Sequence, residues 1–261
     1  MNAYANLNGL NLYYEIHGEG TPLILLHGGL GSTEMSSPMT KTLSQGRRVI
    51  AVDLQAHGRT ADIDRPIRYE AMGDDIAGLI AHLGIEQADL MGYSLGAGVA
   101  LRTAIQHPAV VRKLVVVSTT FRRDGWYPEI MAAVSRMDAA SAESMKQSPL
   151  YKVYARVAPR PKDWPVLLFK LRDLLANDYD WSKEVAAIQT PTLLVFADAD
   201  SILPAHIVEF YSLLGGGKRD AGWDGSGMPQ SQLAILPGLT HYNIPSSPLL
   251  HAAASSFLDR P

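Results

Sequence analysis

Short apolar segments alternate with stretches of helical periodicity over the first half of the chain. Such alternation is typical of a parallel sheet whose strands are joined by helices. Asn8-Gly9, a dipeptide suited to a tight turn, separates two segments that predict an N-terminal hairpin. The predicted strands of this part span residues 4–7, 12–16, 22–26, 48–53, 88–91 and 111–117, and the predicted helices span 33–45, 69–83 and 95–106.

The alternation stops after Ser118, and residues 119–190 have mostly helical character interrupted by prolines. The remaining predicted strands span 192–196 and 232–236, and the remaining helices begin at Pro204 and span 248–258. The pattern predicts an eight-stranded, mostly parallel sheet flanked by helices in one α/β domain. Its core comprises residues 1–118 and 191–261, and residues 119–190 form a helical cap inserted after the sixth strand.

Residues 215–227 contain six glycines and predict a mobile loop. A glycine-rich phosphate cradle follows a strand and carries Lys-Ser or Lys-Thr, whereas Lys218 is followed by Arg219 and a helix precedes this loop. We therefore predict no phosphate site in this segment.

Composition narrows the classes of function. The chain has 261 residues with 23 basic and 26 acidic side chains, so the formal net charge of −3 gives no support for nucleic-acid binding. The absence of Cys excludes disulfides, thiolate catalysis and Cys-ligated zinc. No apolar run approaches the length of a membrane span, and no basic residue precedes Lys41 as a signal peptide requires. We expect a cytoplasmic protein without membrane contacts; the oligomeric state is not predicted.

Gly92-Tyr93-Ser94-Leu95-Gly96 matches the G-x-S-x-G pattern of a nucleophile elbow, and it lies between a predicted strand and a predicted helix. The sharp turn strains the serine backbone, and glycines two positions to either side remove Cβ atoms that would clash. The turn also places Ser94 at a helix N-terminus, where free N–H groups favour negative charge. We predict that Ser94 is a nucleophile.

A serine hydroxyl needs a base, and a base needs an orienting acid. His241 lies in the loop after the last predicted strand, at the sheet edge where ligands bind in α/β folds, so we predict that it is the base. His57 and His206 are interpreted as ordinary surface or capping residues, whereas His27 is expected to shape its loop. Asp124, Asp198 and Asp200 each follow a predicted strand; we choose Asp200, because Asp198 follows its strand so closely that a role in the turn is expected.

The oxyanion of an acyl-transfer intermediate needs two N–H donors. One is predicted to be the backbone N–H of Leu95, and the other comes from the loop His27-Gly28-Gly29-Leu30. Gly29 is the preferred donor of this loop, and Leu30 is the alternative.

Together these residues resemble the α/β-hydrolase superfamily over essentially the whole chain. His27-Gly28-Gly29 is similar to its oxyanion loop, and residues 53–60 are similar to its D-x-x-G-x-G-x-S stretch, with Ala56 and Thr60 as departures. Residues 197–204 resemble its G-x-x-D-x-x-x-P segment, with Ala197 in place of Gly, and residues 238–241 match its G-x-x-H. The resemblance implies a Ser-His-Asp triad with Asp200 as the acid. It does not specify a substrate.

A serine esterase that cleaves small hydrophobic carboxylic esters is the function we predict, with no metal or organic cofactor. A lactonase with the same triad, for example on acyl-homoserine lactones, is the first alternative, and a non-catalytic receptor of the same fold is the second. Residues 119–190 hold 9 of the 20 aromatic residues, which favours an apolar substrate pocket, although these side chains could instead form the core of the cap. The predicted substrate-binding residues are Leu30, Trp126, Tyr127, Tyr154 and Trp164.

Overall fold

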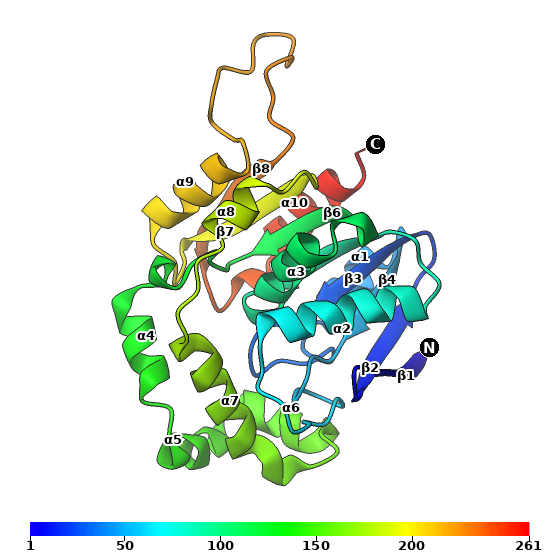
Figure 1. Ribbon diagram of the computed structural model, residues 1–261, viewed down its shortest axis with the longest axis vertical. Coiled ribbons are helices and arrows are strands. Elements are labelled where there is room, and N and C mark those ends of the chain that lie inside the picture. Colours follow the sequence, from blue (N-terminus) through cyan, green and yellow to red (C-terminus); the bar gives the residue numbers. More distant parts are fainter. Residues whose placement is uncertain (261) are drawn as a thin grey trace.

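An eight-stranded sheet runs through the molecule in the order β1-β2-β4-β3-β5-β6-β7-β8 in the computed structural model, which describes residues 1–260 (Figure 1). The pairs β1–β2 and β2–β4 are antiparallel, and the other neighbouring strands are parallel. This confirms the predicted sheet. The strands are β1 (Asn2–Leu7), β2 (Leu10–His17), β3 (Thr21–Leu26), β4 (Arg47–Val52), β5 (Ala88–Tyr93), β6 (Val111–Val117), β7 (Thr192–Ala199) and β8 (Gln232–Thr240).

Helices cover both faces of the sheet, because alternate side chains of each buried strand point to opposite faces and both sets are apolar. In β3, Ile24 and Leu26 belong to a buried cluster with α2 (Tyr69–His82), α3 (Leu95–Gln106) and α9 (Pro204–Leu213). Leu23 and Leu25 belong to a second cluster with α1 (Ser37–Leu43) and α10 (Pro248–Leu258). Helix α1 is shorter than the predicted 33–45, because residues 32–36 form turns before Pro38 at its start.

The α-helices of the insertion between β6 and β7 are α4 (Pro128–Ser135), α5 (Ala139–Ser144), α6 (Pro149–Val157), α7 (Trp164–Ala176) and α8 (Ser182–Ala186). Helices α4, α5, α6 and α7 form a separate group at the lower left of Figure 1, whereas α8 lies beside β7 and α9. The two ends of this insertion lie next to each other. The N–H of Trp181 donates to Phe121 O at 2.9 Å, and the N–H of Arg123 donates to Tyr179 O at 3.0 Å. Its division from the core as a cap over 119–190 stays a prediction.

The glycine-rich segment extends away from the sheet between α9 and β8, as the orange loop of Figure 1. It presents Trp223 fully to solvent. Within residues 1–260, no helix combines the length and the apolar character needed to cross a bilayer.

Two histidines interpreted as surface or capping residues are in fact buried. His57 lies against His27 with 5.1 Å between ring centroids, and its Nδ1–H donates to Gln55 O at 2.8 Å. His206 stacks on Phe121 at 4.1 Å and accepts the Phe121 N–H at Nε2. The turn and helix start that carry them pack inward, which the local sequence pattern does not reveal.

We expect acid to destabilise the protein through these histidines. Burial lowers the pKa of His57 to about 3 and that of His206 to about 4. Below the ordinary value of 6.5 the unfolded chain therefore binds protons that the folded chain excludes, and the free energy of unfolding falls by about 1.4 kcal/mol per pH unit for each histidine. This loss ends as the pH passes the folded pKa.

Urea unfolding between about pH 6 and 4.5 measures this slope. His206→Gln keeps an acceptor for the Phe121 N–H and should reduce the slope by about one histidine's share. The exposed His82 provides the control, since His82→Gln should leave the slope as it is. An unaltered slope in His206→Gln would contradict the burial effect.

Candidate active site

Ser94 forms a strained turn at the end of β5. Its φ of 52° is in the left-handed region, which a serine adopts only when its surroundings impose it. The N–H of Ser94 donates to Val117 O at 2.8 Å, and Ser94 O accepts the N–H of Gly98 in the first turn of α3. The hydroxyl is thereby raised above the sheet edge and faces the start of a helix.

The two glycines of the motif make this turn possible. A Cβ on Gly92 would lie 2.1 Å from the carbonyl oxygen of Gly96, and a Cβ on Gly96 would lie 2.5 Å from that of His27. All of these neighbours are backbone atoms, so rotating a side chain cannot relieve the clash.

We expect Gly96→Ala to lower the free energy of unfolding by about 3 kcal/mol or more, because β3 must move to admit a methyl group. Gly46→Ala is the matched control, since a Cβ there meets nothing within 4 Å. Urea unfolding of the two variants gives the comparison. Equal stabilities would show that the turn tolerates a side chain.

His241 and Asp200 meet Ser94 at this edge from the ends of two other strands. The Nε2 of His241 lies 3.1 Å from Ser94 Oγ, and its Nδ1 lies 2.9 Å from Asp200 Oδ1. The three side chains selected from the sequence are therefore joined by one run of hydrogen bonds. This arrangement can withdraw a proton from the serine hydroxyl while the carboxylate supports the imidazole.

Asp200 is buried among hydrogen-bond donors. It accepts from the N–H groups of Ala197 and Ser201 at 3.0 and 2.8 Å and from the hydroxyl of Ser118 at 2.5 Å. Burial alone would raise the pKa of Asp200, but the hydrogen bonds from His241, Ser118 and Ala197 outweigh it and lower the pKa. The carboxylate consequently stays ionised at neutral pH.

Ser118 also supports the site, which its local sequence did not predict. Its left-handed φ of 53° turns the hydroxyl at the end of β6 toward Asp200. Its place after a buried strand was the one available signal. Tyr93 was also missed as a support: its hydroxyl donates to the carbonyl oxygen of His241 at 2.7 Å.

The two rejected carboxylates have other partners. Asp198 is exposed and accepts the N–H groups of Gly238 and Leu239 in β8 at 2.9 and 3.1 Å. The expected role in the turn after the strand was wrong, because Asp198 lies within β7 and joins it to the neighbouring strand. Asp124 pairs with Arg122 at the surface.

The loop after β3 is held rigidly beside Ser94. His27 donates from Nδ1 to Gly28 O at 2.7 Å and accepts the Leu54 N–H at Nε2. Burial lowers the pKa of His27, and the ring is therefore neutral. Gly29 approaches Leu95 closely, because a Cβ on Gly29 would lie 3.9 Å from that of Leu95. The two peptides predicted to bind an oxyanion therefore lie side by side.

Asp53 fixes this loop from beneath. Its two carboxylate oxygens accept the N–H groups of Thr33 and Arg59, each at 2.7 Å. Of the two departures from the family pattern, Thr60 retains the hydroxyl, which donates to Asp53 O at 2.6 Å. Ala56 adopts a φ of 66°, in the left-handed region that favours glycine, so its backbone is strained.

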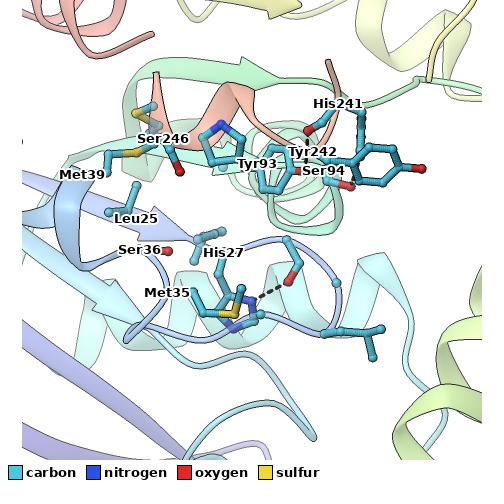
Figure 2. A pocket seen from close by; sticks show the side chains of 18 of the residues that line it. Leu25, His27, Met35, Ser36, Met39, Tyr93, Ser94, His241, Tyr242 and Ser246 are labelled. Atoms are coloured by element: carbon cyan, nitrogen blue, oxygen red, sulfur yellow. Dashed lines mark hydrogen bonds between the residues drawn. The ribbon is translucent and has the colours of Figure 1, made fainter. Parts of the chain in front are cut away.

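A cavity of about 480 Å³ opens beside Ser94, and its size suits a small organic molecule. Its walls come from the loop after β3, the start of α1, the end of β5 and the loop after His241 (Figure 2). Leu30 lines it as predicted, and α6 contributes Leu150. Most of the lining is apolar.

The aromatic residues predicted to bind substrate lie mostly elsewhere. Trp126 packs beside His241, with 5.6 Å between ring centroids, but it does not line the cavity. Tyr127, Tyr154 and Trp164 do not line it either. Trp164 is fully buried, donates to Ala142 O at 3.0 Å and packs against Tyr154, so these rings form the core of the inserted helices.

No metal-binding cluster of side chains is found in the described part of the chain. Among residues 1–260, no group of three or more His, Asp and Glu side chains is placed to hold a metal ion. The hydrogen-bonded side chains at the cavity mouth are Ser94, His241 and Asp200.

Comparison with known proteins gives consistent matches. The family model described as alpha/beta hydrolase fold matches residues 21–153. The chain is 29% identical over 217 residues to the AB hydrolase superfamily protein YisY of Bacillus subtilis, covering 75% of this chain and 80% of that protein. It is 27% identical over 266 residues to a pimeloyl-(acyl-carrier protein) methyl ester esterase of Nitrosospira multiformis, covering 92% and 94%.

The solved structure of an enol-lactonase from Burkholderia xenovorans LB400 superimposes with a TM-score of 0.75 at 21% identity, covering 98% of this chain and 100% of that one. At this identity the likeness shows the fold alone.

Proposed function

Because this chain belongs to the alpha/beta hydrolase fold family, we propose that it is a serine hydrolase that cleaves small apolar carboxylic esters. The observation that carries the proposal is the run of hydrogen bonds from Asp200 through His241 to Ser94 at the mouth of an apolar cavity. An N. multiformis relative is named as a methyl ester esterase, which supports ester chemistry.

In the proposed reaction His241 accepts the hydroxyl proton as Ser94 Oγ attacks the ester carbonyl carbon. The ionised Asp200 holds the imidazole and stabilises the imidazolium that forms. The N–H groups of Leu95 and Gly29 stabilise the oxyanion, each by about 3 kcal/mol in the transition state. His241 then protonates the leaving alkoxide, and water releases the acid from the acyl-enzyme by the same sequence of steps.

The environment of the nucleophile favours an apolar ester. The cavity carries methionine, leucine and proline side chains on its walls, and these bind alkyl groups without a counter-charge. A free carboxylate or phosphate on the substrate would have to give up its hydration there, which is costly.

A panel of p-nitrophenyl esters and lactones tests the proposal. We expect a rapid initial burst of nitrophenol with the esters, one equivalent per Ser94, followed by steady turnover. Preferential hydrolysis of lactones would identify a lactonase with the same machinery. Binding without a burst or turnover would identify a receptor and refute the proposed function.

A further inference from the structure

The cavity beside Ser94 continues away from the inserted helices, and we infer that this continuation binds an unbranched alkyl arm of the substrate. We call it the methionine groove; its walls are Leu25, Met35, Ser36, Met39, Met91, Pro245 and Ser246. The inference rests on the proposed ester hydrolysis and narrows it to esters that carry one long, flexible alkyl arm.

The groove descends toward the α1 and α10 face of the sheet. Leu25, Met39 and Met91 belong to the buried cluster of that face. Figure 2 shows Met39 and Leu25 at one end of the cavity and Ser94 toward the other, with Met35 and Ser36 on one side and Tyr93 and Ser246 on the opposite side. Within residues 1–260, Leu150 is the single contribution of the inserted helices to the lining.

The passage exists because Tyr93 is held to one side. Its hydroxyl donates to the His241 carbonyl oxygen, and its ring occupies the space that a Cβ on Gly28 would enter, at 2.6 Å. The loop after His241 is thereby fixed above the loop after β3. The same cavity has both Ser94 and the three methionines in its lining.

The groove offers no charge to its occupant. Within residues 1–260, no Asp, Glu, Lys or Arg side chain lines the cavity. Apart from two tyrosines, the titratable side chains of the cavity lining are His27 and His241. Both nitrogens of His27 are already hydrogen-bonded within the protein. Three flexible thioether side chains, at Met35, Met39 and Met91, adapt their shape to a linear alkyl chain better than branched or aromatic walls do.

The groove is open to solvent along its rim. Met35 on one side is 43% exposed and Ser246 on the opposite side is exposed as well, whereas Leu25 and Met39 at the end away from Ser94 are buried. An alkyl arm longer than the groove can therefore emerge between α1 and the loop after His241. A closed pocket would instead reject long chains by overlap.

We expect the specificity constant to rise from p-nitrophenyl acetate to the octanoate by about tenfold or more and then to level off through the dodecanoate. The parallel series of acetate esters with lengthening alcohols shows whether the arm belongs to the acyl or the alcohol part. Chain-length preference in either series supports the inference.

Ser36→Trp is designed to fill the groove. The Ser36 hydroxyl makes one long contact, 3.5 Å to Ser32 O, and does not cap α1, so the fold does not depend on it. We expect the octanoate advantage over acetate, which is the ratio of the two specificity constants, to fall to about one in this variant. Ser37→Trp, on the exposed neighbour outside the lining, is the matched control and should keep both rates. Ser246→Trp blocks the opposite wall and should repeat the loss.

Fluorophosphonates separate failure of the groove from failure of the proposed function. Ser94 Oγ displaces fluoride from phosphorus, so labelling of Ser94 by a short probe reports the nucleophile alone. If the short probe labels Ser94 but alkyl length alters neither labelling nor ester hydrolysis, the groove inference is overturned and the serine hydrolase stands. If no probe labels Ser94, both fail.

Discussion

The Ser94→Ala variant is expected to fold normally and to lose ester hydrolysis by roughly 10⁴- to 10⁶-fold. Removing Oγ takes away the atom that forms the acyl-enzyme, while the backbone of the turn stays held by its hydrogen bonds to Val117 and Gly98. His241 loses one partner at 3.1 Å and remains bound to Asp200. The residual rate reports the oxyanion site and binding alone.

Steady-state hydrolysis of p-nitrophenyl butyrate and a circular dichroism melt together measure this effect. Ser37→Ala removes an exposed hydroxyl outside the cavity lining and should leave the rate within about twofold. Residual activity of a folded Ser94→Ala variant within tenfold of the parent would refute the nucleophile.

The Asp200→Asn variant is expected to lower kcat by about 10⁴-fold, far more than Asp198→Asn. An asparagine amide that donates to Nδ1 of His241 replaces a carboxylate that accepts from it. The ring proton then moves from Nδ1 to Nε2, and Nε2 can no longer accept a proton from Ser94. The variant also loses the negative charge of the Asp200 carboxylate, which its lowered pKa keeps ionised at neutral pH.

Asp200→Asn should also lower the free energy of unfolding at neutral pH. Because the folded pKa of Asp200 is lowered, its ionised form stabilises the protein above the ordinary carboxyl pKa, and this contribution disappears as the pH falls through the folded value. Asp198→Asn alters exposed hydrogen bonds to Gly238 and Leu239 and should change kcat by less than about threefold. The opposite ranking of the two variants would identify Asp198 as the acid.

Sequence spacing was sufficient to predict a residue's role where that role depends on its neighbours along the chain. The elbow glycines at 92 and 96 have fixed positions relative to Ser94, so the sequence alone indicated why side chains could not stand there. Alternating apolar segments likewise specified the strands, because burial on both faces of a parallel sheet demands continuous apolar runs.

Distant contacts could not be obtained in this way. The sequence placed Ser118 after a strand but could not show that its hydroxyl meets Asp200, 82 positions away. It also left His57 and His206 as surface residues, because the helices and loops that bury them come from elsewhere in the chain.

The sequence by itself determined the sheet and the nucleophile candidate, and it brought Asp200 and His241 forward, because strand ends in a parallel sheet converge on one edge whatever the side chains around them. The tertiary structure alone decided where the cavity lies. Aromatic residues of 119–190 pack on one another, as Trp164 does on Tyr154, and the space beside Ser94 is instead walled by methionines from α1 and β5. Composition gives the number of apolar side chains, whereas tertiary packing decides which of them are buried against one another and which line the cavity.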